Sequence, residues 1–389
     1  MAIDGTDNPT DRTRTPRLLR SPALRWAVPI GAVVAIGAGV ALTSGNADAA
    51  AKLPPKTAAQ LLVDLAKAPE RQLSGTVVET AKLGLPELPS VAGGGTSLQS
   101  LVTGSHTARV WYGTDRKARV SLVGDLAETD VVRNGDDVWL WSSSTREATH
   151  YTVKKGEQEP SATPPAVATD PATAAKQALA AIDPSTKVEV DGTGYVADRP
   201  VYELSLTPRD ARSLVGSVRL AVDSETSVPL RVQVFARGTQ EPAFETGFTD
   251  VQFEQPAASI FSFTPPAGAK VTEGGSPAAG AQGPATRAHR PATGPQHPDA
   301  AKPDVVGSGW TAVAVLHGVD PAALGQDETA NALLRGTTTV NGSFGSGRLL
   351  RTALVSVLFV GDTTYVGAVE PAVLEQAAAH SATSNSTAP

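Results

Sequence analysis

The strongest constraint on the fold is an alternation of apolar and polar residues that repeats in many short segments. In one segment Tyr202, Leu204 and Leu206 fall on one face, while Glu203 and Ser205 fall on the other. A period of two is typical of a β-strand with one buried face. The segments that show it are 116–123, 130–133, 138–141, 201–206, 218–222, 231–236 and 244–253. Because turn-forming residues separate them at short spacing, the sequence predicts an antiparallel meander.

Two segments have a helical period instead. Residues 57–68 place Leu61 and Leu65 on one face behind Thr57, a suitable N-cap, and residues 170–182 form a second amphipathic segment. The predicted fold class is therefore α+β, with short helices covering an antiparallel sheet. A sheet of about ten strands with one apolar face either closes into a packed barrel or stays partly open around a ligand.

The apolar face of this sheet supplies the candidate ligand-binding residues. Segment 138–141 is apolar on both faces, with Trp139 and Trp141 opposite Val138 and Leu140, and should be central or covered on both sides. Packing against the two helices accounts for most of the apolar side chains, and a cavity accounts for the surplus. The candidate cavity residues are Val120, Leu122, Val138, Leu140, Tyr202, Leu204, Leu206, Leu220, Val222, Val232 and Val234.

A membrane segment is predicted near the N-terminus. Residues 1–25 form a basic tail with five arginines against three aspartates, and residues 26–47 are 22 uncharged, mostly apolar residues. A stretch of this length spans the hydrocarbon core of a bilayer, and the basic flank stays in the cytoplasm. Two outcomes remain open: an uncleaved single-pass signal-anchor in the cell membrane, or a signal sequence cleaved after Ala49, which gives a secreted protein. In both cases the main body is extracytoplasmic.

The composition excludes several kinds of chemistry. The chain has no cysteine, which excludes disulfides, thiolate metal sites and a lipid-modified cysteine. Its formal net charge of −6, without basic runs in the main body, argues against nucleic-acid binding. None of the six histidines has the spacing of a helical metal site, and no phosphate-binding loop, nucleophile elbow or catalytic carboxylate pair is found. We therefore predict no catalytic residue, no metal and no cofactor, in a protein that is not an enzyme.

Several runs resemble one known family in their order along the chain. They lie at 134–141, 200–208, 218–223 and 261–268, the last reading Phe-Ser-Phe-Thr-Pro-Pro-Ala-Gly. In this order they resemble the LolA, LolB and RseB superfamily of periplasmic lipoprotein-binding proteins. The resemblance implies a half-open antiparallel β-barrel wrapped over helices, with an apolar cavity that accepts acyl chains. The superfamily also includes sensors that bind lipids or anti-sigma factors.

The predicted lipid-binding domain covers residues 53–271, and the chain departs from the family pattern at several places. An insertion at 84–105 is predicted to be an exposed flexible loop, or alternatively a flap whose apolar residues dip into the cavity. Residues 265–303 are a Pro/Ala/Gly-rich linker, 304–379 a C-terminal module and 380–389 a disordered tail. A module of about 75 residues is marginal on its own, so it either folds alone or packs against the main sheet. The apolar flap residues are Leu85, Leu88, Val91 and Leu98.

Two functions follow from the apolar face and the resemblance. The first is a membrane-tethered extracytoplasmic carrier or chaperone, which holds the acyl chains of lipids or lipoproteins by burying their methylene groups. The alternative is an RseB-like envelope-stress sensor that regulates a sigma/anti-sigma system through a membrane-protein partner. The tether and the two-module layout motivate this alternative. The membrane itself is a predicted partner through the N-terminal helix.

Overall fold

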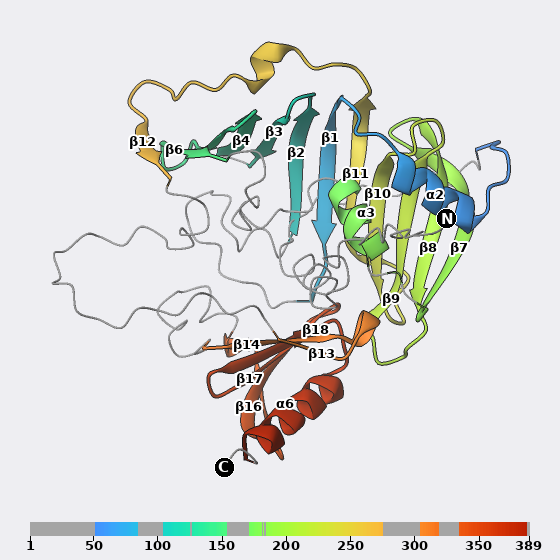
Figure 1. The fold of residues 1–389 in the computed structure, drawn as a ribbon, viewed down its shortest axis with the longest axis vertical. Coiled ribbons are helices and arrows are strands. Elements are labelled where there is room, and N and C mark those ends of the chain that lie inside the picture. Colours follow the sequence, from blue (N-terminus) through green and yellow to red (C-terminus); the bar gives the residue numbers. More distant parts are fainter. Residues whose placement is uncertain are drawn as a thin grey trace, which may run out of the picture.

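A large curved sheet dominates the computed structural model, which describes residues 51–84, 104–124, 127–153, 171–180, 182, 184–274, 304–318 and 334–386. Its strands in chain order are β1 (Leu73–Ala81), β2 (Gly104–Tyr112), β3 (Lys117–Val123), β4 (Glu128–Asn134), β5 (Asp137–Ser142), β6 (Glu147–Thr152), β7 (Thr186–Val196), β8 (Arg199–Pro208), β9 (Val215–Asp223), β10 (Pro229–Ala236), β11 (Pro242–Gln252) and β12 (Lys270–Glu273). In the sheet their order is β12-β6-β5-β4-β3-β2-β1-β11-β10-β9-β8-β7 (Figure 1).

Each half of the sheet is a meander of consecutive strands. Strands β1 to β6 pair in sequence order, as do β7 to β11, and antiparallel pairing of β1 with β11 joins the halves. An antiparallel sheet was predicted, but one pair differs: β12 runs parallel to β6. After β11 the chain crosses the sheet through the 3-10 helix η3 (Ala258–Phe261) before it reaches β6, and a long connection of this kind permits parallel pairing (Figure 1). Among the described residues β7 and β12 are open edges, so the sheet is not a closed barrel.

The alternation of residues identifies part of this sheet. Each of the seven predicted segments coincides within three residues with a strand, namely β3, β4, β5, β8, β9, β10 or β11, which confirms these predictions. The same pattern does not identify β1 and β2. In these strands Glu79 and His106 occupy positions whose neighbours on the same face are apolar, and they interrupt the period.

Two short helices lie over the β7–β11 side of the sheet. Helix α2 (Ala58–Lys67) contacts β7, and α3 (Pro171–Ala180) lies on β10 and β11 (Figure 1). The predicted N-cap is confirmed: the Gln60 backbone N–H donates to Thr57 Oγ1 at 3.2 Å. In return the Thr57 N–H donates to Gln60 Oε1 at 2.8 Å, which completes a capping box.

The C-terminal residues form a second, six-stranded sheet with one long helix. Its strands are β13 (Asp304–Val306), β14 (Val313–His317), β15 (Thr338–Gly342), β16 (Gly345–Arg351), β17 (Ser356–Val360) and β18 (Thr363–Gly367), in the sheet order β13-β14-β18-β17-β16-β15. Helix α6 (Pro371–Ser386) packs on β14, β17 and β18. It runs through residues 380–386 of the predicted tail, where the Ser381 hydroxyl donates to the Ala377 carbonyl at 3.1 Å. The start of the predicted linker likewise belongs to β12.

The C-terminal module packs against the main sheet, the second of the two arrangements left open by its size. Backbone hydrogen bonds join Leu214 N–H to Ala368 O at 2.9 Å and Ala353 N–H to Leu83 O at 2.8 Å. The buried indole N–H of Trp310 donates to a hydroxyl oxygen of β7, Thr186 Oγ1, at 2.8 Å. Side chains of the module therefore share one core with the main sheet.

Several predicted features lie outside the described residues. They are the basic tail 1–25, the membrane segment 26–47 and the flap residues Leu85, Leu88, Val91 and Leu98. Within the described part of the chain, no helix has both the length and the apolar character needed to span a bilayer.

Candidate functional site

The candidate site is the face of the twelve-stranded sheet on which α2 and α3 lie, called the inner face below. Residues directly opposite each other on paired strands share a face, so the strand register defines it. One row crosses six neighbouring strands in register, from Leu204 through Leu220, Val232, Thr246 and Glu79 to His106. The row is apolar on β8 to β10 and becomes polar on β11, β1 and β2.

The inner face of β7 to β10, called the packed part, holds most of the predicted cavity residues. Tyr202, Leu204, Leu206, Leu220, Val222 and Val232 are each at most 3% exposed and belong to one buried cluster, against which Val234 packs. The same cluster contains Leu61 of α2, Ala175 of α3 and Leu354 of the C-terminal module. The structure thus brings seven of the eleven candidates together, and side chains of the protein itself cover them.

The remaining four candidates lie on the inner face of β3 to β5, called the half-buried part. Val120, Leu122, Val138 and Leu140 are all half-buried. Val120 stands in register with Val131 and Leu140 on the next two strands. Val131 is also half-buried and was not among the candidates, although the alternation of segment 130–133 contains it. Helices α2 and α3 lie on this same face but over β7, β10 and β11, away from β3 to β5 (Figure 1).

Three polar side chains lie between these two parts, and we call them the polar row: Thr246, Glu79 and His106. Glu79 is 1% exposed and Thr246 is fully buried, and within the described part of the protein neither Glu79 oxygen nor Thr246 Oγ1 has a hydrogen-bond partner. Burial raises the pKa of Glu79 to about 8 and lowers the pKa of His106 to about 4. Both side chains are therefore uncharged at neutral pH.

The sequence prediction missed the polar row. Glu79 lies two residues after Val77 and two before Ala81, so the period of two places it on the buried face of its strand. This inward position could have identified Glu79 from the sequence. A carboxylate at an inward position is the kind of buried polar group that marks a functional site more often than an exposed one does.

The opposite, outer face of β3 to β6 carries aromatic and ionic contacts. Trp139 stacks on His150 with ring centroids 4.5 Å apart, and Phe263 contacts both Trp139 and Trp141. His150 also bonds Asp137 and Glu273 at 3.0 Å each. Burial acts to lower the His150 pKa, but these two carboxylates outweigh it and the pKa is raised. The tryptophans therefore point away from Val138 and Leu140, as the alternation predicted.

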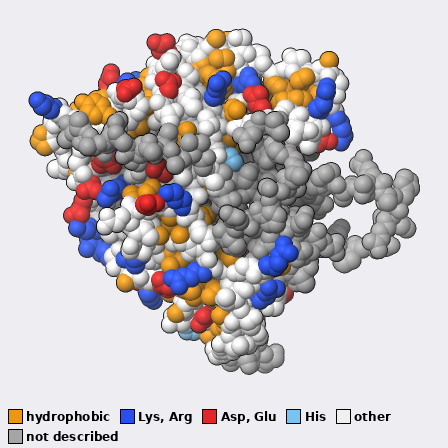
Figure 2. Space-filling model, turned by 180° about the vertical axis from the view of Figure 1, so that it is seen from behind, with side chains coloured by type: hydrophobic (Ala, Val, Ile, Leu, Met, Phe, Trp, Pro, Cys, Tyr) orange, Lys and Arg blue, Asp and Glu red, His pale blue; other side chains and the backbone are white. Residues whose placement is uncertain are grey.

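The charged surface shows no single dominant sign. Figure 2 shows Lys and Arg side chains interspersed with Asp and Glu side chains on the face seen there. In the described ranges no group of three or more His, Cys, Asp or Glu side chains has an arrangement that could hold a metal ion.

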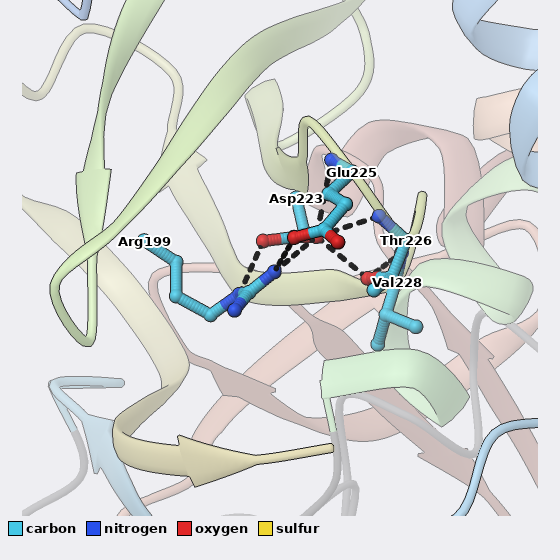
Figure 3. A network of polar contacts seen from close by, with 5 residues as sticks. All are labelled: Arg199, Asp223, Glu225, Thr226 and Val228. Atoms are coloured by element: carbon cyan, nitrogen blue, oxygen red, sulfur yellow. Dashed lines mark hydrogen bonds and ion pairs between the residues drawn. The ribbon is translucent and has the colours of Figure 1, made fainter.

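A buried ionic network fixes the turn after β9 (Figure 3). The Asp223 carboxylate accepts hydrogen bonds from Arg199 Nε at 2.6 Å, and from Thr226 N–H and Oγ1 at 2.7 Å each. Burial acts to raise the Asp223 pKa, but the bonds from Arg199 and Thr226 outweigh it and hold the pKa below its usual value. The turn therefore explains the charge of Asp223 without a ligand.

Comparisons with known proteins give one family match. Residues 100–260 match the family model described as the MucB/RseB N-terminal domain. No curated protein matches the chain. Among solved structures, the MucA/MucB complex of Pseudomonas aeruginosa has 18% identity and a TM-score of 0.40, covering 82% of this chain and 96% of that chain. A LolA superfamily protein from Nitrosomonas europaea has 11% identity and a TM-score of 0.20, covering 54% and 99%. The Mycobacterium tuberculosis lipoprotein LppX has 9% identity and a TM-score of 0.28, covering 51% and 97%.

Proposed function

Starting from the match of residues 100–260 to the MucB/RseB N-terminal domain, which confirms the predicted resemblance, we propose that this chain binds acyl chains outside the cytoplasm. The acyl chain belongs to a lipid or lipoprotein and lies on the half-buried part of the inner face. Segment 26–47 tethers the protein to the membrane, so that bound chains stay near their source. The role is binding and release, without catalysis.

The observation that supports this proposal is the half-buried apolar row on β3 to β5. Val120, Val131 and Leu140 lie in register, and together with Leu122 and Val138 they form a continuous apolar strip that remains partly exposed. Neighbouring strands are about 4.8 Å apart, so the strip offers a track about 10 Å wide. Burying each methylene of a ligand there contributes about 0.8 kcal/mol.

Two adjacent residues of β3 give a direct test with a matched control. Leu122 faces inward and Val123, which is 48% exposed, faces outward. The chain has no cysteine, so Leu122→Cys and Val123→Cys each carry one unique labelling site in the full-length protein. With an environment-sensitive fluorophore at each site, a monoacylglycerol should change the emission at position 122 and leave position 123 nearly unchanged. No change at position 122, or equal changes at both, contradicts the proposal.

The natural ligand is identified separately. The full-length protein, isolated from cells and extracted with organic solvent, should release acyl lipid in a constant ratio to protein, measured by mass spectrometry. A protein that is reproducibly free of lipid contradicts carriage.

A regulatory role is the second candidate, and the family match favours it. The matched model is that of MucB and RseB, and the C-terminal module shares the buried cluster of the packed part. In this role, binding of the acyl chain changes the affinity of the protein for a membrane-protein partner. Affinity capture of the full chain from membranes should then yield a partner whose amount changes when monoacylglycerol is added. Capture that is independent of acyl ligand contradicts this role.

A further inference from the structure

The polar row combines deep burial with unused hydrogen-bonding groups. Glu79 and Thr246 stand directly opposite each other on β1 and β11, where side chains on one face have Cβ atoms about 4.5–5.5 Å apart. Both side chains are at most 1% exposed, and neither donates to the other. Along their own strands their neighbours on this face are apolar, namely Val77 and Ala81 on β1 and the two phenylalanines that flank Thr246 on β11. Across the sheet, on β2, Glu79 also stands opposite His106.

Such an arrangement is unfavourable for the protein alone. A buried carboxyl without a partner loses its hydration and gains nothing in return, and most buried polar groups in proteins are hydrogen-bonded. The Asp223 carboxylate shows the usual solution, since Arg199 and Thr226 surround it. The lack of hydrogen-bond partners for Glu79 and Thr246 among the described residues suits a partner from outside the chain.

The protonation states select the chemistry of that partner. Because the pKa of Glu79 is about 8, its carboxyl group carries a proton at neutral pH and can donate it in a hydrogen bond. The Thr246 hydroxyl is a second donor. Among the described residues of β2 and β11, which flank β1, the titratable side chains on this face are His106 and Tyr112. His106 stands opposite Glu79 and is neutral with a pKa of about 4, whereas Tyr112 stands opposite Leu73 at the far end of β2. Two donors without a positive charge suit a neutral carbonyl oxygen, which has two lone pairs, better than a carboxylate or a phosphate.

We propose that Glu79 and Thr246 bind the carbonyl oxygen of an ester- or amide-linked acyl chain whose hydrocarbon lies on the half-buried part. This inference rests on the proposed function, because the polar row lies at the border of that apolar strip. It adds a specificity: acylated molecules are held by their linkage as well as by their chain, and plain hydrocarbons are held by the chain alone.

The test compares ligands that differ only at the head of the chain. The full-length Leu122→Cys protein, labelled with the fluorophore, is titrated with a methyl ester, an alkane and an alkylamine of equal chain length. The ester should bind about tenfold more tightly than the alkane, as expected for hydrogen bonds made in a buried site. Glu79→Leu and Thr246→Val should each reduce this preference to less than about threefold, because they weaken binding of the ester. Glu79→Gln keeps a donor and should retain part of the preference.

Glu245→Gln is the matched control. Glu245 neighbours Thr246 on β11 but points to the outer face, where it bonds Gln233 at 3.0 Å, so its replacement should leave the ester preference intact. An ester preference that persists in both Glu79→Leu and Thr246→Val overturns the inference and leaves the proposed function standing. A preference for the alkylamine that depends on Glu79 also overturns it, because the site then takes a cation. If the labelled Leu122→Cys protein, without any further substitution, binds none of the three ligands, the proposed function itself fails. Should Glu79→Leu unfold, Thr246→Val and Glu79→Gln decide the outcome.

Discussion

The packed part and the half-buried part belong to the same face of the same sheet, yet their side chains have different environments. Leu204 on β8 is completely buried beneath helices and the C-terminal module, whereas Leu140 on β5 is half-buried. Both residues occupy equivalent positions in alternating strands. The difference arises from what covers the strands, because α2, α3 and Leu354 of the module reach only one side. Apolar residues on a sheet face therefore define a binding surface only where the rest of the chain leaves them accessible.

The comparison predicts unequal costs for the same substitution in the two parts. Leu204→Ala should reduce the free energy of unfolding by about 4 kcal/mol, because it leaves a cavity in a filled core. Leu140→Ala should reduce it by only about 1 kcal/mol, because less area is lost from a half-buried site. Urea denaturation of both variants measures the difference. Equal losses would show that the half-buried part is packed as firmly as the other.

The polar row between the parts predicts an unusual dependence of stability on pH. The pKa of Glu79 rises from 4.5 to about 8 on folding, so between these values the folded state binds more protons and stability falls as pH increases. Glu79→Gln removes this penalty and should stabilise the protein by about 3 kcal/mol at pH 7, with no gain below pH 4.5. His106 acts in the opposite direction, because its pKa falls from 6.5 to about 4 and stability rises with pH between them. Urea denaturation at several pH values measures both effects. A Glu79→Gln variant that is no more stable than the unsubstituted protein at pH 7 would contradict the raised pKa of Glu79.

The turn after β9 follows directly on a strand of the packed part. Asp223→Asn should cost about 2 kcal/mol at pH 7, since it weakens charge-assisted bonds to Arg199 and leaves that cation partly unpaired. The folded pKa of Asp223 is lowered, so its contribution is complete above the ordinary value of 3.8 and is lost as pH falls below it. The difference in melting temperature between the Asp223→Asn variant and the unsubstituted protein should therefore become smaller in acid. Asp191→Asn, at a half-exposed side chain, is the control and should have little effect.

A small effect is expected where the C-terminal module touches the sheet. Trp310→Phe removes the hydrogen bond to Thr186 and should lower stability by about 1 kcal/mol, measured by thermal unfolding. If the module is only loosely attached, the melting temperature will not change.

The sequence predicts the elements and faces of this fold better than it predicts the site. Helix α2 follows from Thr57 and its leucines, and the alternation assigns Leu122 and Leu140 to one face, as the strand register confirms. The alternation does not identify strands β1 and β2, because Glu79 and His106 stand where apolar residues are expected. The cover over the packed part depends on contacts between segments far apart in the chain, such as Leu354 with β8 to β10, and no local pattern encodes them.

The pairing of β1 with β11 determines when the polar row exists during folding. The meanders β1 to β6 and β7 to β11 each contain contacts between neighbours in the chain, which form early, whereas Glu79 meets Thr246 only when two distant strands join. Until the chain has been made through residue 252, β1 keeps one edge unpaired, and such an edge is prone to associate with other chains. The polar row is therefore assembled by the long-range closing step, and neither meander alone contains it.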